Sequence, residues 1–254
     1  MKWYRLLPKR VQARLNLSRY AVDLFVQAVA KEVPPGALLL DAGAGDCRYA
    51  PLFAHCRSVS LDFGLGEPKW DYTRLDVVGD LLAMPLRDGS VDAVLTTQTL
   101  EHVAEPWTFL REIARVLKPG GRLYLTAPQG FREHQRPHDY FRFTRFALAN
   151  LAEGAGLRVV RLEPQSGYFW YLSDRLRPLH SMLFSKRRHW LVKLLMLPAE
   201  VWSSLFCRVL APLACYRLDR LDRDRAYTTG YNLVAEKPRT SGVTSEVSQD
   251  FGSL

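Results

Sequence analysis

Apolar runs of five to eight residues alternate with helical patterns between residues 37 and 163. Each run is short and bounded by turn-forming residues, which is typical of a buried strand. The six runs are Ala37–Asp41, Arg57–Asp62, Arg74–Gly79, Val91–Gln98, Arg122–Ala127 and Leu157–Leu162. Between them, Pro106 opens a helical pattern and Thr144 is expected to cap a helix that reaches about Glu153. With a last strand at Tyr231–Glu236, this order predicts a mostly parallel seven-stranded α/β sheet with helices on both faces.

The segments outside this alternation have different patterns. Residues 1–32 predict an amphipathic helix, and residues 164–226 predict a helical, basic and aromatic insertion before the last strand. The core is then expected at 33–163 and 227–238, and the Ser-, Thr- and Gly-rich tail at 239–254 is expected to be disordered. The apolar stripe expected on the first helix consists of Leu17, Tyr20, Ala21, Leu24, Phe25 and Ala28.

Length and composition fit one globular domain with an appendage. The chain has 254 residues, of which 48% are hydrophobic and 24% charged, so a disordered, collagen-like or coiled-coil protein is excluded. The four cysteines, at positions 47, 56, 207 and 215, have neither C-x-x-C nor metal-ligand spacing. We therefore expect a reduced, cytoplasmic protein and predict no metal site.

The net charge of +9 is concentrated in two segments. Residues 1–20 carry +6 and residues 171–226 carry +6, whereas residues 21–170 carry −2 and the rest −1. Such segments suit an anionic membrane surface, nucleic acid or acidic substrates, and a solvated basic face explains them equally well.

No membrane-spanning segment is predicted. Lys9, Arg10 and Arg14 interrupt the N-terminal region, which leaves no apolar core of a signal peptide. Residues 190–216 are the most apolar part of the chain, but their longest uncharged run, Val209–Tyr216, is far below the roughly 20 residues of a spanning helix.

Three candidate ligand positions follow successive strands. Asp41-Ala42-Gly43-Ala44-Gly45 forms a glycine-rich turn after the first strand, although Arg48 stands where a dinucleotide fingerprint needs glycine. Asp62 ends the second strand, and Asp80-Leu81 follows the third. Alone, each could be a structural turn or a solvated acid. Together they indicate a binding site, because open α/β sheets bind ligands at the carboxyl ends of their strands.

These residues match a known family in the order in which they occur. The motifs resemble the class I S-adenosylmethionine-dependent methyltransferases, particularly the type 11 subgroup. They are the glycine-rich turn, Asp62, Gly79-Asp80-Leu81 with Met84-Pro85 downstream, Thr99-Leu100-Glu101-His102-Val103 and Arg115-Val116-Leu117-Lys118-Pro119-Gly120-Gly121. The resemblance covers about half of the chain and implies a Rossmann-like fold. Cys47 departs from it, since many members have a third glycine there.

The resemblance also implies which residues hold S-adenosylmethionine. Gly43, Ala44 and Gly45 would line its methionine part with Asp41 nearby, and Gln98 would face the same part. Asp62 would take the ribose hydroxyls, and Asp80 with Leu81 would hold the adenine.

Methyl transfer of this kind depends mainly on alignment, and an oxygen or nitrogen acceptor can also need a general base. The candidate bases are His102, which alternatively fixes its loop, and His138 and Asp139, which alternatively tie down theirs. We expect a small-molecule, lipid or lipid-linked glycan acceptor, with the basic segments on the inner face of the membrane. The alternatives are a nucleic-acid methyltransferase of the same fold, which the scattered basic residues do not favour, and a non-catalytic cofactor- or membrane-binding module.

Overall fold

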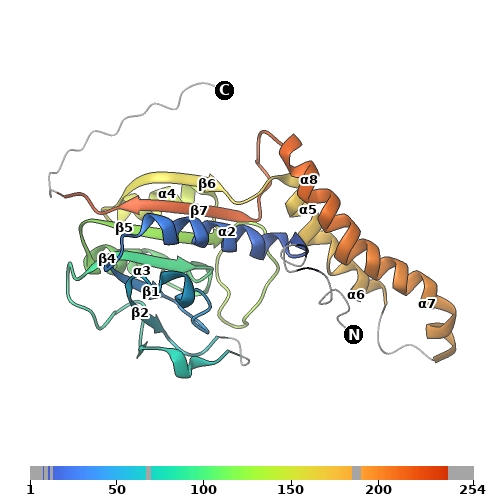
Figure 1. Ribbon diagram of the computed structural model, residues 1–254, viewed down its shortest axis with the longest axis horizontal. Coiled ribbons are helices and arrows are strands. Elements are labelled where there is room, and N and C mark those ends of the chain that lie inside the picture. Colours follow the sequence, from blue (N-terminus) through green and yellow to red (C-terminus); the bar gives the residue numbers. More distant parts are fainter. Residues whose placement is uncertain (1–7, 9–10, 12–13, 67–69, 185–189, 240–254) are drawn as a thin grey trace.

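A computed structural model describes residues 8, 11, 14–66, 70–184 and 190–239. They build one seven-stranded sheet in the order β3-β2-β1-β4-β5-β7-β6, in which only β7 runs antiparallel to its neighbours (Figure 1). The strands are β1 (Leu38–Ala42), β2 (Arg57–Asp62), β3 (Val77–Val78), β4 (Val91–Thr97), β5 (Leu117–Pro128), β6 (Arg158–Pro164) and β7 (Gly230–Glu236). The predicted mostly parallel sheet is confirmed.

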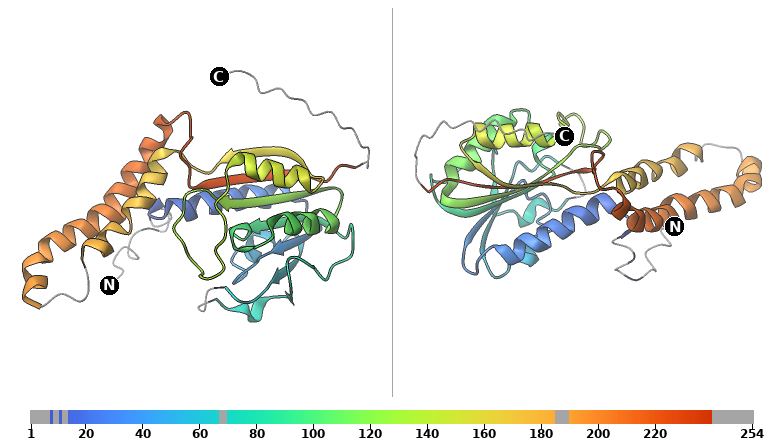
Figure 2. Two further views of the ribbon diagram at one scale, coloured as in Figure 1. Left: turned by 180° about the vertical axis from the view of Figure 1, so that it is seen from behind. Right: turned by 90° about the horizontal axis from the view of Figure 1, so that it is seen from above.

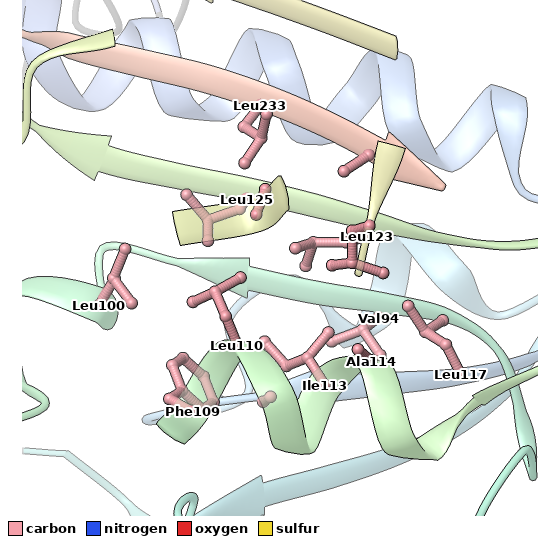
Figure 3. Packing of buried hydrophobic residues seen from close by; sticks show 14 of the residues in the cluster. Val94, Leu100, Phe109, Leu110, Ile113, Ala114, Leu117, Leu123, Leu125 and Leu233 are labelled. Carbon is pink, nitrogen blue, oxygen red and sulfur yellow. The ribbon is translucent and has the colours of Figure 1, made fainter. Parts of the chain in front are cut away.

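Helices cover both faces of this sheet. On one face, α3 (Pro106–Val116) and α4 (Arg145–Gly154) share a single apolar cluster with the central strands. Figure 3 shows Phe109, Leu110 and Ile113 of α3 directed at Leu123 and Leu125 of β5. On the opposite face lies α2 (Leu17–Glu32), which Figure 2 shows running along the sheet.

The buried face of α2 differs from the predicted stripe. Leu24 and Ala28 are exposed, whereas Val22, Val26 and Val29 pack on β1, β4 and β5. Apolar residues occupy so many positions of this helix that two overlapping stripes are available, and contact with the sheet selects the one rich in valine. Leu17, Ala21 and Phe25 of the predicted stripe are buried, as expected.

The connections near the turn after β1 are shorter than the alternating pattern implied. Between β1 and β3, the only helical elements of the described chain are two short 3-10 turns, Ala50–Phe53 and Tyr72–Arg74. The predicted strand Arg74–Gly79 shrinks to the two residues of β3, at the edge of the sheet. No long helix lies between β1 and β2 in the described chain. This side of β1 is covered instead by α2 and by the side chain of Phe53.

Residues 168–184 and 190–221 form a helical arm that projects beyond the sheet (Figures 1 and 2). It consists of α5 (Tyr168–Leu176), α6 (Leu179–Leu183), α7 (Trp190–Leu205), a π-helical segment (Phe206–Leu210), α8 (Ala211–Leu218) and a 3-10 turn (Asp219–Leu221). The continuous helix Leu194–Leu221 is long and apolar enough to cross a membrane by length and composition, contrary to the expectation from charge spacing. The tail expected to be disordered falls mostly on residues 240–254, outside the described chain.

Replacing Phe25 tests whether α2 is an integral part of the core. Phe25→Ala removes a side chain that is 6% exposed, and we expect the free energy of unfolding to fall by about 3–5 kcal/mol. Leu24→Ala, at a side chain that is 42% exposed, should change it by no more than about 0.5 kcal/mol. Urea unfolding measures both. Equal effects of the two substitutions would contradict this packing.

Candidate functional site

The candidate site is a cavity of about 260 Å³ at the carboxyl ends of β1, β2 and β4. Strands β1 and β4 are neighbours in the sheet but not in the sequence, which makes this the switch point where such folds bind ligands. Five predicted cofactor residues line it, namely Gly43, Asp62, Asp80, Leu81 and Gln98. Asp41, Ala44 and Gly45 do not line it.

Gly43 sets the shape of the cavity wall. Its φ is +82°, and a Cβ atom there would lie 2.3 Å from the side chain of Thr99, which follows β4. Only glycine therefore fits at this point, where the turn after β1 meets the segment after β4. Gly45 acts differently, because its N–H donates a 2.9 Å hydrogen bond to the Asp62 carboxylate.

The two carboxylates of the cavity are held by their own turns. Asp62 Oδ2 accepts from Gly45, and its Oδ1 accepts from the N–H of Gly64 at 2.8 Å. Asp80 Oδ1 accepts from the N–H of Leu82 at 2.8 Å. A carboxylate offers about four lone-pair positions, so both side chains can accept further hydrogen bonds from a ligand.

The backbone also explains the departure from the family pattern at Cys47. This residue has a φ of +55°, a conformation in which glycine is favoured, and its side chain is buried. Cysteine occupies the position at a backbone cost and fills space that a glycine would leave empty.

Asp41 lies behind the cavity wall. Its residue is 8% exposed, and burial, together with the nearby Asp62 carboxylate, raises the pKa of Asp41 to about 7. The charge of Asp41 therefore changes near neutral pH.

Several cavity residues were not predicted. Phe63 and Leu65 follow β2 directly, and their position after Asp62 was a local signal that could have identified them. Trp70 and Gln135 come from long loops, and for these two residues no local sequence pattern indicated the site. Thr99 begins the motif Thr99-Leu100-Glu101-His102-Val103, but its contact with Gly43 is visible only in the folded chain.

The structure separates the three candidate bases. His102 and His138 line the cavity, but Asp139 does not. Both Asp139 oxygens accept hydrogen bonds from Arg142, at 2.7 and 2.8 Å, and these bonds hold the pKa of Asp139 well below its usual range. Asp139 is therefore a poor proton acceptor, and it fixes the loop instead.

A cluster of Glu101, His102 and His134 lies beside the cavity. The Glu101 side chain is fully buried, which raises its pKa to about 8. Burial lowers the pKa of both histidines, so their rings are neutral at physiological pH. The sequence predicted only His102 as a candidate base, and Glu101 stood beside it in the family motif. His134 was not predicted, because it reaches the cluster from a loop 32 residues away.

The chain is similar to known proteins over this region. A sequence profile described as a methyltransferase domain matches residues 40–125. A protein named as a probable S-adenosylmethionine-dependent methyltransferase, from Mycolicibacterium smegmatis, is 35% identical over 99 residues, which are 37% of this chain and 38% of that protein. A demethylmenaquinone methyltransferase from Renibacterium salmoninarum is 40% identical over 95 residues, 35% of this chain and 40% of that protein.

A solved structure extends the likeness to the fold of most of the chain. The 1,6-didemethyltoxoflavin-N1-methyltransferase of Burkholderia thailandensis, with S-adenosylhomocysteine bound, has a TM-score of 0.50 at 17% identity. The match covers 87% of this chain and 78% of that one. The curated relatives match over less, since the chain spans about two fifths of the length of each of the two described above.

The raised pKa of Asp41 predicts a pH dependence of stability. Between about pH 4 and 7 the folded state keeps the Asp41 proton, while the unfolded state has lost it. Raising the pH through this window therefore lowers the free energy of unfolding, by at most about 1.4 kcal/mol per pH unit from this group. Asp41→Asn should remove that contribution, so the variant should gain stability relative to the wild type as the pH rises. Urea unfolding of the cofactor-free protein from pH 5 to 8 measures it, and parallel curves would contradict it.

Proposed function

We propose that this protein, whose residues 40–125 form a class I S-adenosylmethionine-dependent methyltransferase domain, methylates a lipid or lipid-linked acceptor at an anionic membrane surface. The observation that carries the acceptor class is the exposed apolar arm, which contacts the loop that supplies Gln135 and His138 to the cavity. A relative named for demethylmenaquinone supports a small organic acceptor.

The residues of the cavity fit the cofactor. The turn at Gly43 brings main chain to the cavity without a side chain, and Asp62 and Asp80 offer carboxylate oxygens at the ends of neighbouring strands. In the arrangement that the family implies, Asp62 would take the ribose hydroxyls, and Asp80 with Leu81 would hold the adenine. The cofactor supplies a methyl group that is bound to a positively charged sulfur. The neutral thioether left after the transfer is a good leaving group.

The protein then contributes alignment and exclusion of water. Phe63, Leu65 and Trp70 give the cavity apolar walls, which favour an apolar acceptor and keep water away from the reacting atoms. Of the candidate bases, His102 and His138 line this cavity. His138 also contacts the Tyr140 hydroxyl through Nδ1, at 3.1 Å, and that contact orients its ring.

The arm exposes more apolar surface than its fold requires. Leu195 is 82% exposed, Met182 74% and Trp202 61%. Further exposed apolar side chains on the arm are Leu183, Val192, Leu194, Leu197, Val201, Phe206 and Leu210. Contiguous exposed apolar surface of this kind marks an interaction site with a membrane or a partner.

The charge of the arm favours a membrane over an uncharged protein surface. Residues 171–226 carry +6, and the connection at 185–189 alone contains Lys186, Arg187 and Arg188 in its sequence. Helices that combine a buried apolar stripe with basic residues lie in the interface of anionic bilayers. Each basic side chain near such a surface contributes about 1 kcal/mol.

The arm is proposed to lie on the membrane rather than to cross it. The C-terminal half of the long helix is part of the folded protein, where Cys207, Ala211 and Cys215 are buried. Asp219 beyond α8 accepts hydrogen bonds from the N–H groups of Gly167 and Trp170, both at 2.9 Å. A full crossing by Leu194–Leu221 would break these contacts, so α6 and α7 are the segments free to enter lipid.

The root of the arm contacts the loop that forms one wall of the cavity. Arg175 donates to the carbonyl oxygen of Gly130, and the ring of Tyr171 packs so close to Gly130 that a Cβ there would clash. The same loop carries Gln135 and His138 of the cavity. An acceptor leaving the lipid would therefore meet the cavity mouth beside the root of the arm.

Labelled methyl transfer tests the reaction and its acceptor class. Purified protein incubated with membrane extract and methyl-labelled S-adenosylmethionine should transfer label into the organic phase. Asp80→Ala should weaken cofactor binding by roughly 5- to 150-fold, because a lost hydrogen bond to a buried partner costs about 1–3 kcal/mol. Asp88→Ala, at an exposed carboxylate outside the cavity, is the matched control.

The position of the label separates the alternatives. Label in nucleic acid would favour a nucleic-acid methyltransferase, and cofactor binding without any labelled product would favour a non-catalytic module. Either result contradicts the proposed acceptor class.

Vesicle sedimentation tests the role of the arm. The protein should sediment with phosphatidylglycerol vesicles but not with phosphatidylcholine vesicles, and less at high salt, because exposed charges are screened over about 8 Å at physiological ionic strength. Deleting residues 1–13, which precede the buried residues Leu15 and Leu17, should also reduce recovery. Leu195→Glu with Trp202→Glu should abolish it, whereas Phe146→Glu, at a similarly exposed apolar residue of α4, should not. Equal recovery with both lipids, or with neither, would instead indicate a solvated arm.

A further inference from the structure

A buried carboxylate beside the cavity has no hydrogen bond among the described residues. Glu101 lies in the 3-10 turn Leu100–His102 that follows β4, and its residue is 0% exposed. Neither of its side-chain oxygens has a hydrogen-bond partner in the described chain. A buried carboxyl group without partners is costly, so a group that compensates for it is expected at this position.

Two histidines next to Glu101 each have a ring nitrogen that faces the cluster without a hydrogen-bond donor. His102 Nδ1 contacts the carbonyl oxygen of His138. His134 Nδ1 contacts the carbonyl oxygen of Arg132 at 3.2 Å and a carboxylate oxygen of Asp139 at 3.4 Å. Because carbonyl and carboxylate oxygens only accept, each Nδ1 carries the hydrogen of its ring. In a ring with one hydrogen, Nε2 is then the nitrogen that carries the lone pair.

These two lone pairs face each other. The Nε2 atoms of His102 and His134 are 3.1 Å apart, and Glu101 Oε1 is 3.8 Å from Nε2 of His102. Three electron-rich atoms in one small space repel one another unless a positive charge lies among them. The cluster is thus complementary to a cation.

The ligand set and its surroundings match those of metal sites. All three ligand atoms lie within 4.8 Å of one another. With metal–nitrogen bonds of 2.0–2.1 Å, two ligands of a tetrahedral ion are about 3.3 Å apart, close to the spacing of the two histidines. Histidine ligands also commonly donate their second N–H to a carbonyl or carboxylate oxygen, as both rings do here.

We propose that Glu101, His102 and His134 bind a divalent first-row transition metal ion in the wall of the cavity. Two imidazoles and one carboxylate suit ions such as Zn²⁺, Fe²⁺ or Co²⁺ better than Mg²⁺ or Ca²⁺, which prefer oxygen ligands. The sequence predicted no metal site. This site could not be recognised there because its third ligand, His134, comes from a distant loop. It does not depend on the identity of the acceptor.

Such an ion would join two walls of the cavity. His102 lines the cavity from the end of β4, and His134 belongs to the loop that also supplies Gln135 and His138. The main chain of this loop already bonds to Glu101, whose carbonyl accepts from the N–H of Tyr140 at 2.8 Å. Binding of the ion would therefore order the loop beside the cavity.

Metal titration of the full-length protein tests the site without reference to activity. Tag-free protein stripped with a chelator is titrated with Co²⁺ and with Zn²⁺, followed by visible absorption and calorimetry. We expect one ion per chain, with nitrogen coordination visible in the Co²⁺ spectrum. Glu101→Gln and His134→Gln keep approximately the original side-chain volume and should weaken binding more than about 100-fold, since even outer partners of metal ligands are worth about 10- to 100-fold.

The control is His55→Gln, at a histidine outside the cluster whose Nε2 contacts the carbonyl of Val33. It should bind metal like the wild type. Thermal unfolding of the metal-free variants shows whether each has folded. Absence of saturable binding by the wild type would overturn the proposal and leave a proton as the cation between the rings, and so would unchanged affinity in folded His134→Gln.

Discussion

The cavity depends on the close approach of Gly43 to Thr99. The turn after β1 and the segment after β4 touch at this point, and there is room only for a glycine hydrogen between them. The contact lies where the strand order reverses, so it fixes the two sides of the crevice relative to each other. Thr99 is followed directly by the turn Leu100–His102. The same constraint therefore positions the glycine-rich turn, Gln98 and the Glu101–His102 pair.

The central strands could be predicted from the sequence because β1 and β4 are mostly buried, and a buried parallel strand is a short continuous apolar run. The strand Arg57–Asp62, which is only partly buried, was also predicted with its observed bounds. Features decided by tertiary contact could not be predicted in the same way. The helix α2 offers two apolar stripes, and only the sheet selects between them. The edge strand β3 is reduced to two residues, which pair with Leu61 and Asp62 of β2.

The site was predictable where its residues follow strands and unpredictable where they come from long loops. Asp62 and Asp80 are marked by their position at strand ends, and both line the cavity. Trp70, His134 and Gln135 lie in loops without periodicity, and only the folded chain brings them to the site. Asp139 was a candidate base on residue type alone. Arg142, three residues later, pairs with it through two hydrogen bonds, and that spacing was visible in the sequence.

The loop between β5 and α4 contacts the arm and the core and also carries residues of the cavity. At its start, Gly130 contacts Tyr171 and Arg175 of the arm. In its middle, Arg142 donates to the carbonyl oxygens of Phe131 and Arg132 as well as to Asp139, which gives the loop a fixed shape of its own. The arm contacts the loop at Gly130, and the core contacts it through the carbonyl oxygen of Glu101, which accepts from the N–H of Tyr140. These two contacts lie on either side of Gln135 and His138, so the part of the loop that lines the cavity is held at both of its ends.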